Sequence, residues 1–327
     1  MQEISFRDAL NQALDEELAR DDAVFLMGEE VAEYNGAYKV SQGLFDKYGE
    51  RRIIDTPITE LGFAGVGIGS AMLGLRPVIE MMTWNFAILA MDQIINTAAK
   101  MRLMSGGVYE VPITFRGPNG AAHMLSAQHS QACENWYCNV PGLKVVMPSC
   151  PNDGKGLLKS SIRDDDPVIF MESEIMYNDV GPCSDAKDYL IPLGQCDIKR
   201  PGTDVTVVSY SKGVKHALRA AEILAKDGVS VEVIDLMTLK PLDMETVRAS
   251  VRKTNRCVTV EESWPFGGLG AELTYRIQSQ CFDWLDAPVI RVTSLDIPMP
   301  YAENLEALTV PNEHDVVTAI NTVLYRS

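Results

Sequence analysis

The chain has 327 residues, of which 29 are Lys or Arg and 45 are Asp or Glu, so its formal net charge at pH 7 is -16. Nucleic-acid modules need a basic face for the phosphates, and polybasic membrane anchors need clustered Lys and Arg, so the charge argues against both partners. With 46% hydrophobic and 23% charged residues the composition is that of a globular protein, and the length predicts two domains of about 150 residues each.

The first half of the chain alternates helical and strand patterns. Ser5 followed by Asp8 predicts a capped helix whose apolar spacing continues to Ala19. Short apolar runs then predict parallel strands, buried on both faces and separated by helices, at 23–27, 52–55, 76–82, 111–116, 144–148 and 167–172. This pattern predicts an α/β domain over residues 1–180.

The second half repeats the alternation more clearly. Strands are predicted at 204–210, 229–235, 256–261 and 288–292, and helices at 213–226, 244–253 and 270–278. Residues 181–202 are rich in Pro and Gly and lack a period, which predicts a linker. The fold expected is therefore α/β, with two doubly wound domains at 1–180 and 203–327.

The amino terminus and the cysteines indicate a reducing compartment. Residues 1–5 lead into an acidic amphipathic segment without the basic start and apolar run of a signal peptide, and no apolar run approaches the roughly 20 residues that span a bilayer. The seven cysteines are odd in number and lack metal-ligand spacing, which predicts free thiols. We expect a protein of the bacterial cytoplasm, although a processed protein of an organelle matrix would have the same features.

Three segments carry candidate chemistry. A glycine cluster over 62–74 does not match the dinucleotide fingerprint and predicts a helix packed closely on the sheet or on a partner helix. Glu60 precedes it in a strand-to-helix loop among apolar residues, which is typical either of a ligand-binding carboxylate or of a surface glutamate. His129 follows a glycine-rich loop in a polar segment. This position is equally consistent with acid-base catalysis and with a surface or capping histidine.

An acidic run at 163–167 ends in proline. Such runs usually form a solvated helix end, but free carbonyls at a helix carboxyl terminus also bind cations. The chain lacks the Gly-Asp-Gly motif with a downstream Asn that holds the metal and diphosphate in thiamine diphosphate enzymes. It also lacks a Gly-x-Ser-x-Gly nucleophile elbow, which argues against hydrolase chemistry.

Together these segments resemble the beta subunits of the thiamine-diphosphate-dependent decarboxylating component of 2-oxo acid dehydrogenase complexes, above all those acting on pyruvate. The resembling stretches follow one another in the family's order at 28–31, 55–63, 116–120, 128–131, 141–146, 155–157, 163–167 and 298–301. The resemblance implies a pyrimidine-binding domain and a transketolase-like carboxyl-terminal domain in an α2β2 heterotetramer. The alpha subunit would hold the diphosphate and most of the Mg2+ coordination, and the glycine helix would lie at a subunit interface.

The resemblance also implies roles for single residues. Glu60 matches the glutamate that hydrogen-bonds the aminopyrimidine ring of thiamine diphosphate, Phe86 matches an aromatic packed on that ring, and Met82 is a further neighbour. His129 matches a histidine that assists reductive acetylation of the lipoyl group. The positions of potassium ligands, largely backbone oxygens, fall on Ile113, Ser161, Ile162, Asp164 and Asp166.

The implied function is decarboxylation of pyruvate from glycolysis and transfer of the acetyl group to the lipoyl domain of a dihydrolipoyl acyltransferase, for acetyl-CoA formation. The acidic second domain would dock on a basic domain of the acyltransferase core. Two alternatives stay open: a beta subunit acting on branched-chain 2-oxo acids or acetoin, and a non-catalytic docking subunit.

Overall fold

The computed structural model describes residues 1–326 and divides into two compact units. Unit 1 comprises Met1–Asn119 and Trp136–Leu193, and unit 2 comprises Gly120–Asn135 and the chain from Gly194 onward. Residues 120–135, which the sequence analysis placed in the first domain, therefore belong to the second unit. Ser327, the last residue of the predicted second domain, lies outside the described residues.

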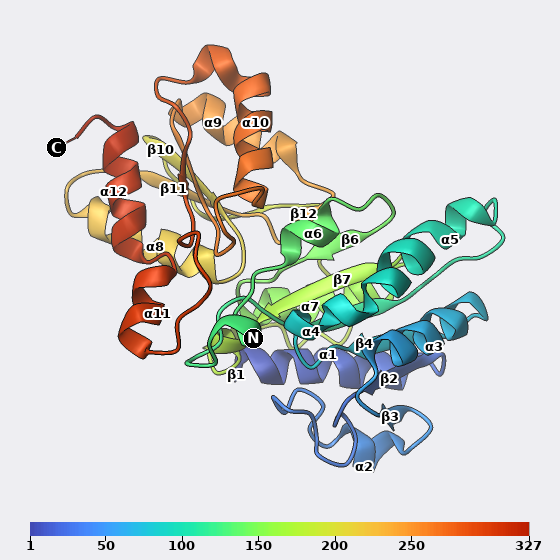
Figure 1. The fold of residues 1–327 in the computed structure, drawn as a ribbon. Helices are drawn as coiled ribbons and strands as arrows, with labels where there is room; N and C mark the ends of the chain where they lie inside the picture. Colours follow the sequence, from blue (N-terminus) through green and yellow to red (C-terminus); the bar gives the residue numbers. More distant parts are fainter. Residues whose placement is uncertain (327) are drawn as a thin grey trace. The chain divides into compact units, whose positions relative to one another are not determined.

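Unit 1 is built on a parallel sheet (Figure 1). Its strands lie in the order β3-β2-β4-β5-β7-β6, with bounds β2 Val24–Gly28, β3 Ile53–Asp55, β4 Arg76–Glu80, β5 Thr114–Asn119, β6 Lys144–Val146 and β7 Val168–Ser173. A separate antiparallel pair joins β1 Gln2–Ser5 to β8 Val180–Cys183. The predicted strands are confirmed, and their ends differ from the prediction by at most three residues.

The helices of unit 1 include α1 Phe6–Arg20, α2 Leu44–Tyr48, α3 Glu60–Met72, α4 Trp84–Ala87, α5 Ala99–Met104 and α7 Pro151–Ile162, and α6 Glu134–Cys138 crosses the unit boundary. The predicted start of α1 is confirmed, because the Ser5 side chain accepts a hydrogen bond from the Asp8 backbone N–H at 3.1 Å. A π-helical segment lies at Gln93–Ala98, and single turns of 3-10 helix lie at Ile88–Ala90 and Glu174–Met176 in unit 1 and at Ala127–His129 and Phe282–Trp284 in unit 2.

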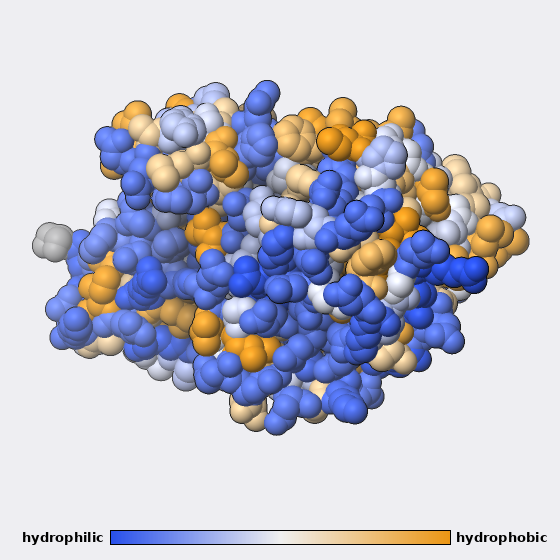
Figure 2. Space-filling view, turned by 90° about the horizontal axis from the view of Figure 1, so that it is seen from below, coloured by the Kyte–Doolittle hydropathy of each residue, from blue (hydrophilic) through white to orange (hydrophobic). Residues whose placement is uncertain are grey.

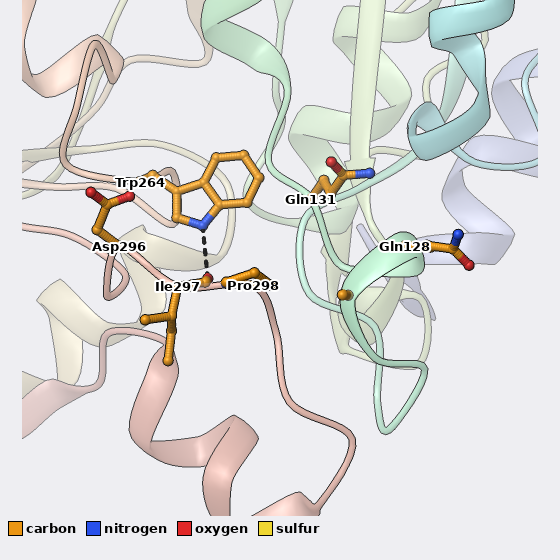
Figure 3. A pocket seen from close by; sticks show the side chains of 7 residues that line it. Gln128, Gln131, Trp264, Asp296, Ile297 and Pro298 are labelled. Carbon is orange, nitrogen blue, oxygen red and sulfur yellow. Dashed lines mark hydrogen bonds between the residues drawn. The ribbon is translucent and has the colours of Figure 1, made fainter.

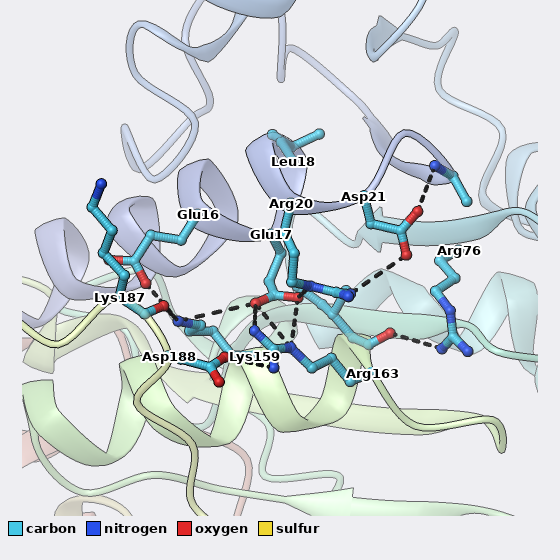
Figure 4. Close-up of polar contacts among 12 residues, drawn as sticks. Glu16, Glu17, Leu18, Arg20, Asp21, Arg76, Lys159, Arg163, Lys187 and Asp188 are labelled. Carbon is cyan, nitrogen blue, oxygen red and sulfur yellow. Dashed lines mark hydrogen bonds and ion pairs between the residues drawn. The ribbon is translucent and has the colours of Figure 1, made fainter.

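An ionic network joins α1 to α7 (Figure 4). The fully buried Glu17 carboxylate accepts hydrogen bonds from Arg163 Nη2 and Arg20 Nε, both at 2.7 Å. Lys159 Nζ, also fully buried, lies 2.6 Å from Glu16 Oε2 and donates to the backbone carbonyl of Lys187. Buried charges are tolerated only when they are paired. The network therefore fixes both α1 and the segment around Lys187 against α7.

Unit 2 contains a second α/β sheet in the order β14-β13-β10-β11-β9. The strands are β9 Asp197–Arg200, β10 Val205–Ser209, β11 Val231–Asp235, β13 Cys257–Val260 and β14 Ile290–Val292, with a further short strand, β12 Thr238–Lys240. The helices are α8 Lys212–Ala225, α9 Met244–Thr254, α10 Leu269–Cys281, α11 Glu303–Thr309 and α12 Glu313–Val323. Buried valines of the strands and alanines of α8 form its core.

The predicted linker, residues 181–202, contains hydrogen-bonded strand at both ends. β8 pairs with β1 within unit 1, and β9 is an antiparallel edge strand of the unit 2 sheet. β8 contains Gly and Pro and alternates exposed and buried residues, and β9 is polar and largely exposed, so neither shows the apolar run by which a central strand is recognised. Within residues 1–326, no helix has the length and apolar character needed to cross a membrane.

Candidate functional site

The strand order of unit 1 creates a ligand position at the carboxyl edge of its sheet. The chain runs from β2 to β3 on one side, and after α3 it returns to β4 on the other side of β2. Connections that leave one strand edge in opposite directions open a crevice beyond the strand ends, where α/β proteins bind ligands. Glu60 follows β3 and opens α3, so it lies at this edge.

Two buried carboxylates meet at this position. Glu60 is 7% exposed, and Glu29, which directly follows β2, is 6% exposed. Burial, and then the negative charge of Glu60, raises the pKa of Glu29 to about 7. Glu29 Oε1 is buried and has no hydrogen-bond partner among residues 1–326. Glu29 can therefore hold or release a proton near neutral pH, and its Oε1 is a buried hydrogen-bond acceptor that is still available.

Backbone hydrogen bonds fix the loops that carry the two carboxylates. The Asp55 carboxylate accepts the N–H groups of Ala32 at 2.7 Å and Glu33 at 3.1 Å. The Thr56 N–H donates to the Gly28 carbonyl at 3.0 Å. Because Asp55 ends β3 and Gly28 ends β2, these bonds tie the two loops together and hold the carboxylates in place.

Met82 and Phe86 lie beyond β4, the strand on the other side of β2. Both are partly exposed, and the Thr83 side chain caps α4, in which Phe86 lies. Gly117 of β5 allows this loop its close approach, because a Cβ there would lie 2.1 Å from the Met81 carbonyl oxygen. The adjacent strands β3, β2 and β4 are thus followed by Glu60, by Glu29, and by Met82 and Phe86, respectively.

His129 lies in unit 2, on the short turn Ala127–His129, and is partly exposed. The same turn borders a cavity of about 490 Å³ (Figure 3). Trp264 forms an apolar wall of this cavity, and its Nε1–H donates to the Ile297 carbonyl at 3.2 Å. The sequence did not indicate this cavity, because its walls come from segments more than 120 residues apart. The lining residues are Ala127, Gln128, Gln131, Trp264, Asp296, Ile297 and Pro298.

The acidic run carries ion pairs. Lys144 Nζ lies 2.7 Å from both oxygens of the Asp164 carboxylate, and Arg102 Nη1 lies 2.6 Å from Asp166 Oδ1. Arg76 Nη1 donates to the carbonyls of Ile162 at 3.2 Å and Asp164 at 3.1 Å. The Asp164 and Asp166 carboxylates are thus committed to cationic side chains, whereas each carbonyl oxygen keeps a second lone pair.

The remaining candidate ligands lie beside this run. Ser161 is buried near the end of α7, and the Ile113 carbonyl accepts the Val168 N–H at 2.9 Å. Among residues 1–326 no cluster of three or more His, Cys, Asp or Glu side chains suited to a metal ion occurs.

A second histidine, His216 of α8, is largely buried. Its side chain is only 16% exposed, and its Nδ1 lies 3.2 Å from Glu313 Oε2. α8 packs against α12, and burial lowers the pKa of His216. His314, near the start of α12, is exposed.

Comparison with known proteins also divides the chain in two, with residues 120–135 counted in the first part. Residues 2–179 match the family model of the transketolase pyrimidine binding domain, and residues 194–316 match that of the transketolase C-terminal domain. Among solved structures, the chain "Split gene transketolase, inactive beta4 tetramer" superposes with a TM-score of 0.80, covers 98% of both chains and is 23% identical. This likeness confirms the two-domain α/β fold.

Curated relatives cover nearly the whole chain. "Pyruvate dehydrogenase E1 component subunit beta, mitochondrial" of Homo sapiens is 55% identical over 98% of this chain and 91% of its own length. The proteins of the same name from Drosophila melanogaster and Dictyostelium discoideum are 56% and 54% identical, over 98% and 99% of this chain and 89% and 92% of their own lengths. The chain belongs to the family of pyruvate dehydrogenase E1 component beta subunits.

Proposed function

We propose that this chain, with an alpha subunit, decarboxylates pyruvate through thiamine diphosphate and passes the acetyl group to a lipoyl group. The observation that carries the proposal is the buried Glu29 and Glu60 pair at the sheet's switch point, in a chain that matches pyruvate dehydrogenase beta subunits over almost its whole length. The relatives' names favour pyruvate over branched-chain 2-oxo acids or acetoin, and the buried acidic pair favours catalysis over a docking role.

The carboxylate pair suits the aminopyrimidine of the cofactor. Bound thiamine diphosphate supplies a cationic ring that accepts the electron pair released when carbon dioxide leaves. Glu60 would hold the pyrimidine ring nitrogen and share a proton with it. Glu29, whose pKa is raised to about 7, would be half protonated near neutral pH and so able to donate or accept a proton beside the cofactor. Phe86 and Met82 would supply the apolar surface that keeps water from the ring.

His129 is proposed to act at the second step. Its imidazole is accessible on a loop next to a cavity, so it would donate a proton to the lipoyl sulfur when the acetyl group is transferred. An acyltransferase core that bears the lipoyl domain would receive the product and form acetyl-CoA. Loss of acetyl transfer in His129→Ala, with decarboxylation kept, is the expected result.

An alpha subunit is proposed to complete the site and to hold the diphosphate with its Mg2+. The outer face of α3 supports a partner, because it presents Gly62, Val66, Gly69 and Leu73 at helical spacing, with Val66 63% and Leu73 85% exposed. Figure 2 shows apolar surface at its right-hand edge, the side on which Figure 1 draws α3 and α5. An α2β2 assembly would cover such surface. Sedimentation of the mixed subunits tests this.

A potassium ion is proposed to be coordinated by backbone carbonyl oxygens only, because the acidic side chains nearby are ion-paired. Such an ion would order the loop at the end of α7 without taking part in the chemistry. A melting temperature that is the same in potassium and in choline chloride would contradict this role. The carbonyls concerned are those of Ile113, Ser161, Ile162, Asp164 and Asp166.

A reducing compartment is proposed for the protein. No disulfide joins the seven cysteines, all of which lie within residues 1–326, and Cys133, Cys183, Cys257 and Cys281 are buried. The curated relatives are named mitochondrial. We propose the bacterial cytoplasm, with the organelle matrix as the alternative, and cell fractionation decides between them.

The deciding experiment compares wild type with Glu60→Gln after each is assembled with the alpha subunit. Gln cannot share a proton as a carboxylic acid does, so decarboxylation of pyruvate should fall by about a hundredfold or more, the usual range for acid-base groups. Assembly should be unchanged in sedimentation. Equal decarboxylation by the two proteins would overturn the assignment, and a preference for 2-oxoisovalerate over pyruvate would favour the branched-chain alternative.

A further inference from the structure

Two carboxylates of unit 2 hold the loop that carries His129. The base of the loop closes where the Gly120 N–H donates to the Gln131 carbonyl at 3.0 Å. Farther along, the Ala121 N–H donates to Glu262 Oε1, and the Met124 N–H donates to Glu306 Oε2 at 2.9 Å. Glu262 follows β13, and Glu306 lies on α11, so two separate segments of unit 2 accept hydrogen bonds from one loop.

Glu262 is itself firmly anchored. Its Oε2 lies 3.0 Å from Lys212 Nζ, whose side chain is 8% exposed, and its backbone carbonyl accepts a hydrogen bond from Ser294 Oγ at 2.5 Å. Gly120 has a φ of +85°, and a Cβ there would lie 2.7 Å from Glu262 Oε1. A glycine is therefore required both for the backbone turn and for the approach of the carboxylate.

The loop adopts a conformation that it would not select by itself. Met124 and Ser126 have positive φ values of 54° and 65°, which residues with a side chain rarely adopt and which cost about 1–3 kcal/mol each. Such residues persist only where their surroundings determine the conformation. Glu306 binds the N–H of Met124 itself, and the His129 N–H donates to the Ser126 carbonyl at 3.3 Å. The strained turn from Met124 to Ser126 thus links the Glu306 contact at one end to the backbone of His129 at the other.

We propose that Glu306, together with Glu262, is a positioning residue for His129 in acetyl transfer to the lipoyl group. The proposal rests on the role given to His129 above. Without the Glu306 acceptor, the turn at Met124 and Ser126 relaxes toward negative φ values and His129 loses its fixed orientation. Decarboxylation depends on Glu60 in unit 1, so it does not require this contact.

The test uses the assembled α2β2 protein with Glu306→Ala, Glu306→Gln or the control Glu303→Ala. Glu303 lies on the same first turn of α11 and is exposed. Acetyl transfer to an isolated lipoyl domain should slow about tenfold in Glu306→Ala, the effect of losing one charge-assisted hydrogen bond. Pyruvate decarboxylation with ferricyanide as electron acceptor should stay unchanged. Glu306→Gln keeps an acceptor oxygen and should restore most of the transfer rate, and Glu303→Ala should match wild type.

Amide hydrogen exchange over residues 121–129 in the same assemblies supplies a readout independent of activity. Exchange should be faster in Glu306→Ala than in wild type or Glu303→Ala. Unchanged exchange, unchanged acetyl transfer, or an equal loss of both activities in Glu306→Ala overturns the positioning role. If the wild-type assembly does not decarboxylate pyruvate, the proposed function fails instead, and the exchange result still decides whether Glu306 holds the loop.

Discussion

Glu29 is a single residue whose pKa is set by its buried environment. Its neighbours in sequence, Gly28 and Glu30, give no sign that this carboxylate differs from any of the other acidic residues. Its pKa near 7 comes from removal of water and from the charge of Glu60, which lies about 30 positions later. The loop position of Glu60 after a strand was visible in the sequence, whereas the environment that perturbs Glu29 was not.

The raised pKa predicts a pH-dependent stability. Because the folded chain binds the Glu29 proton more tightly than the unfolded chain, whose glutamates titrate near 4.5, its stabilising contribution is complete below about pH 4.5 and is lost as the pH rises through about 7. Glu29→Gln should raise the free energy of unfolding at pH 8 by about 2 kcal/mol and change it little at pH 4.5. Urea unfolding at both pH values measures this, with the exposed Glu33→Gln as control. A gain of equal size at both pH values would contradict the titration of Glu29.

At the scale of elements, α3 has two faces with different tasks. Gly67 lies against the sheet, where a Cβ would lie 2.6 Å from Ile79 Cδ1, and Gly69 has no atom within 4 Å of its Cβ position. The sequence predicts that the glycine cluster packs closely either on the sheet or on a partner helix. The structure gives close packing on the sheet to Gly67, whereas Gly69 faces outward beside Val66 and Leu73.

Because the two faces have different surroundings, a larger residue at Gly67 should affect the stability of the chain, whereas one at Gly69 should affect assembly. Gly67→Val should destabilise the isolated chain by about 1–3 kcal/mol, because overpacking against Ile79 shifts the sheet contact. Gly69→Phe should leave the isolated chain as stable as wild type within about 0.5 kcal/mol and should prevent binding of the alpha subunit. Urea unfolding and sedimentation distinguish the two effects. Normal assembly of Gly69→Phe would show that this face is not an interface.

The loop 120–135 packs within unit 2, although the sequence places it in the first domain. It follows β5 of unit 1 in sequence, so its position in the chain predicted membership of the first domain. Its backbone hydrogen bonds instead go to Glu262 and Glu306, which lie more than 130 residues later. A loop without apolar periodicity carries no local signal of the domain on which it folds.

At the scale of the whole molecule, the charge of -16 predicts how the protein binds its complex. If the assembled protein docks on a basic domain of the acyltransferase, the attraction is screened as the Debye length falls from about 10 Å at 0.1 M salt to about 3 Å at 1 M. The Kd should therefore rise at least about tenfold over this range, but not in sucrose of equal osmolality. Calorimetric titration measures both. A Kd independent of salt would point to apolar docking.

The sequence by itself determined the central strands of the two α/β sheets, the three main helices of the second unit and the loop position of Glu60, because apolar periodicity and turn residues act over a few neighbours. Only the tertiary structure decided that Glu29 is buried beside Glu60, that the acidic run is ion-paired to Lys144 and Arg102, and that Glu262 and Glu306 grip the His129 loop. Burial and charge pairing join residues far apart in the chain. Their energies depend on distances that exist only after the sheets have formed.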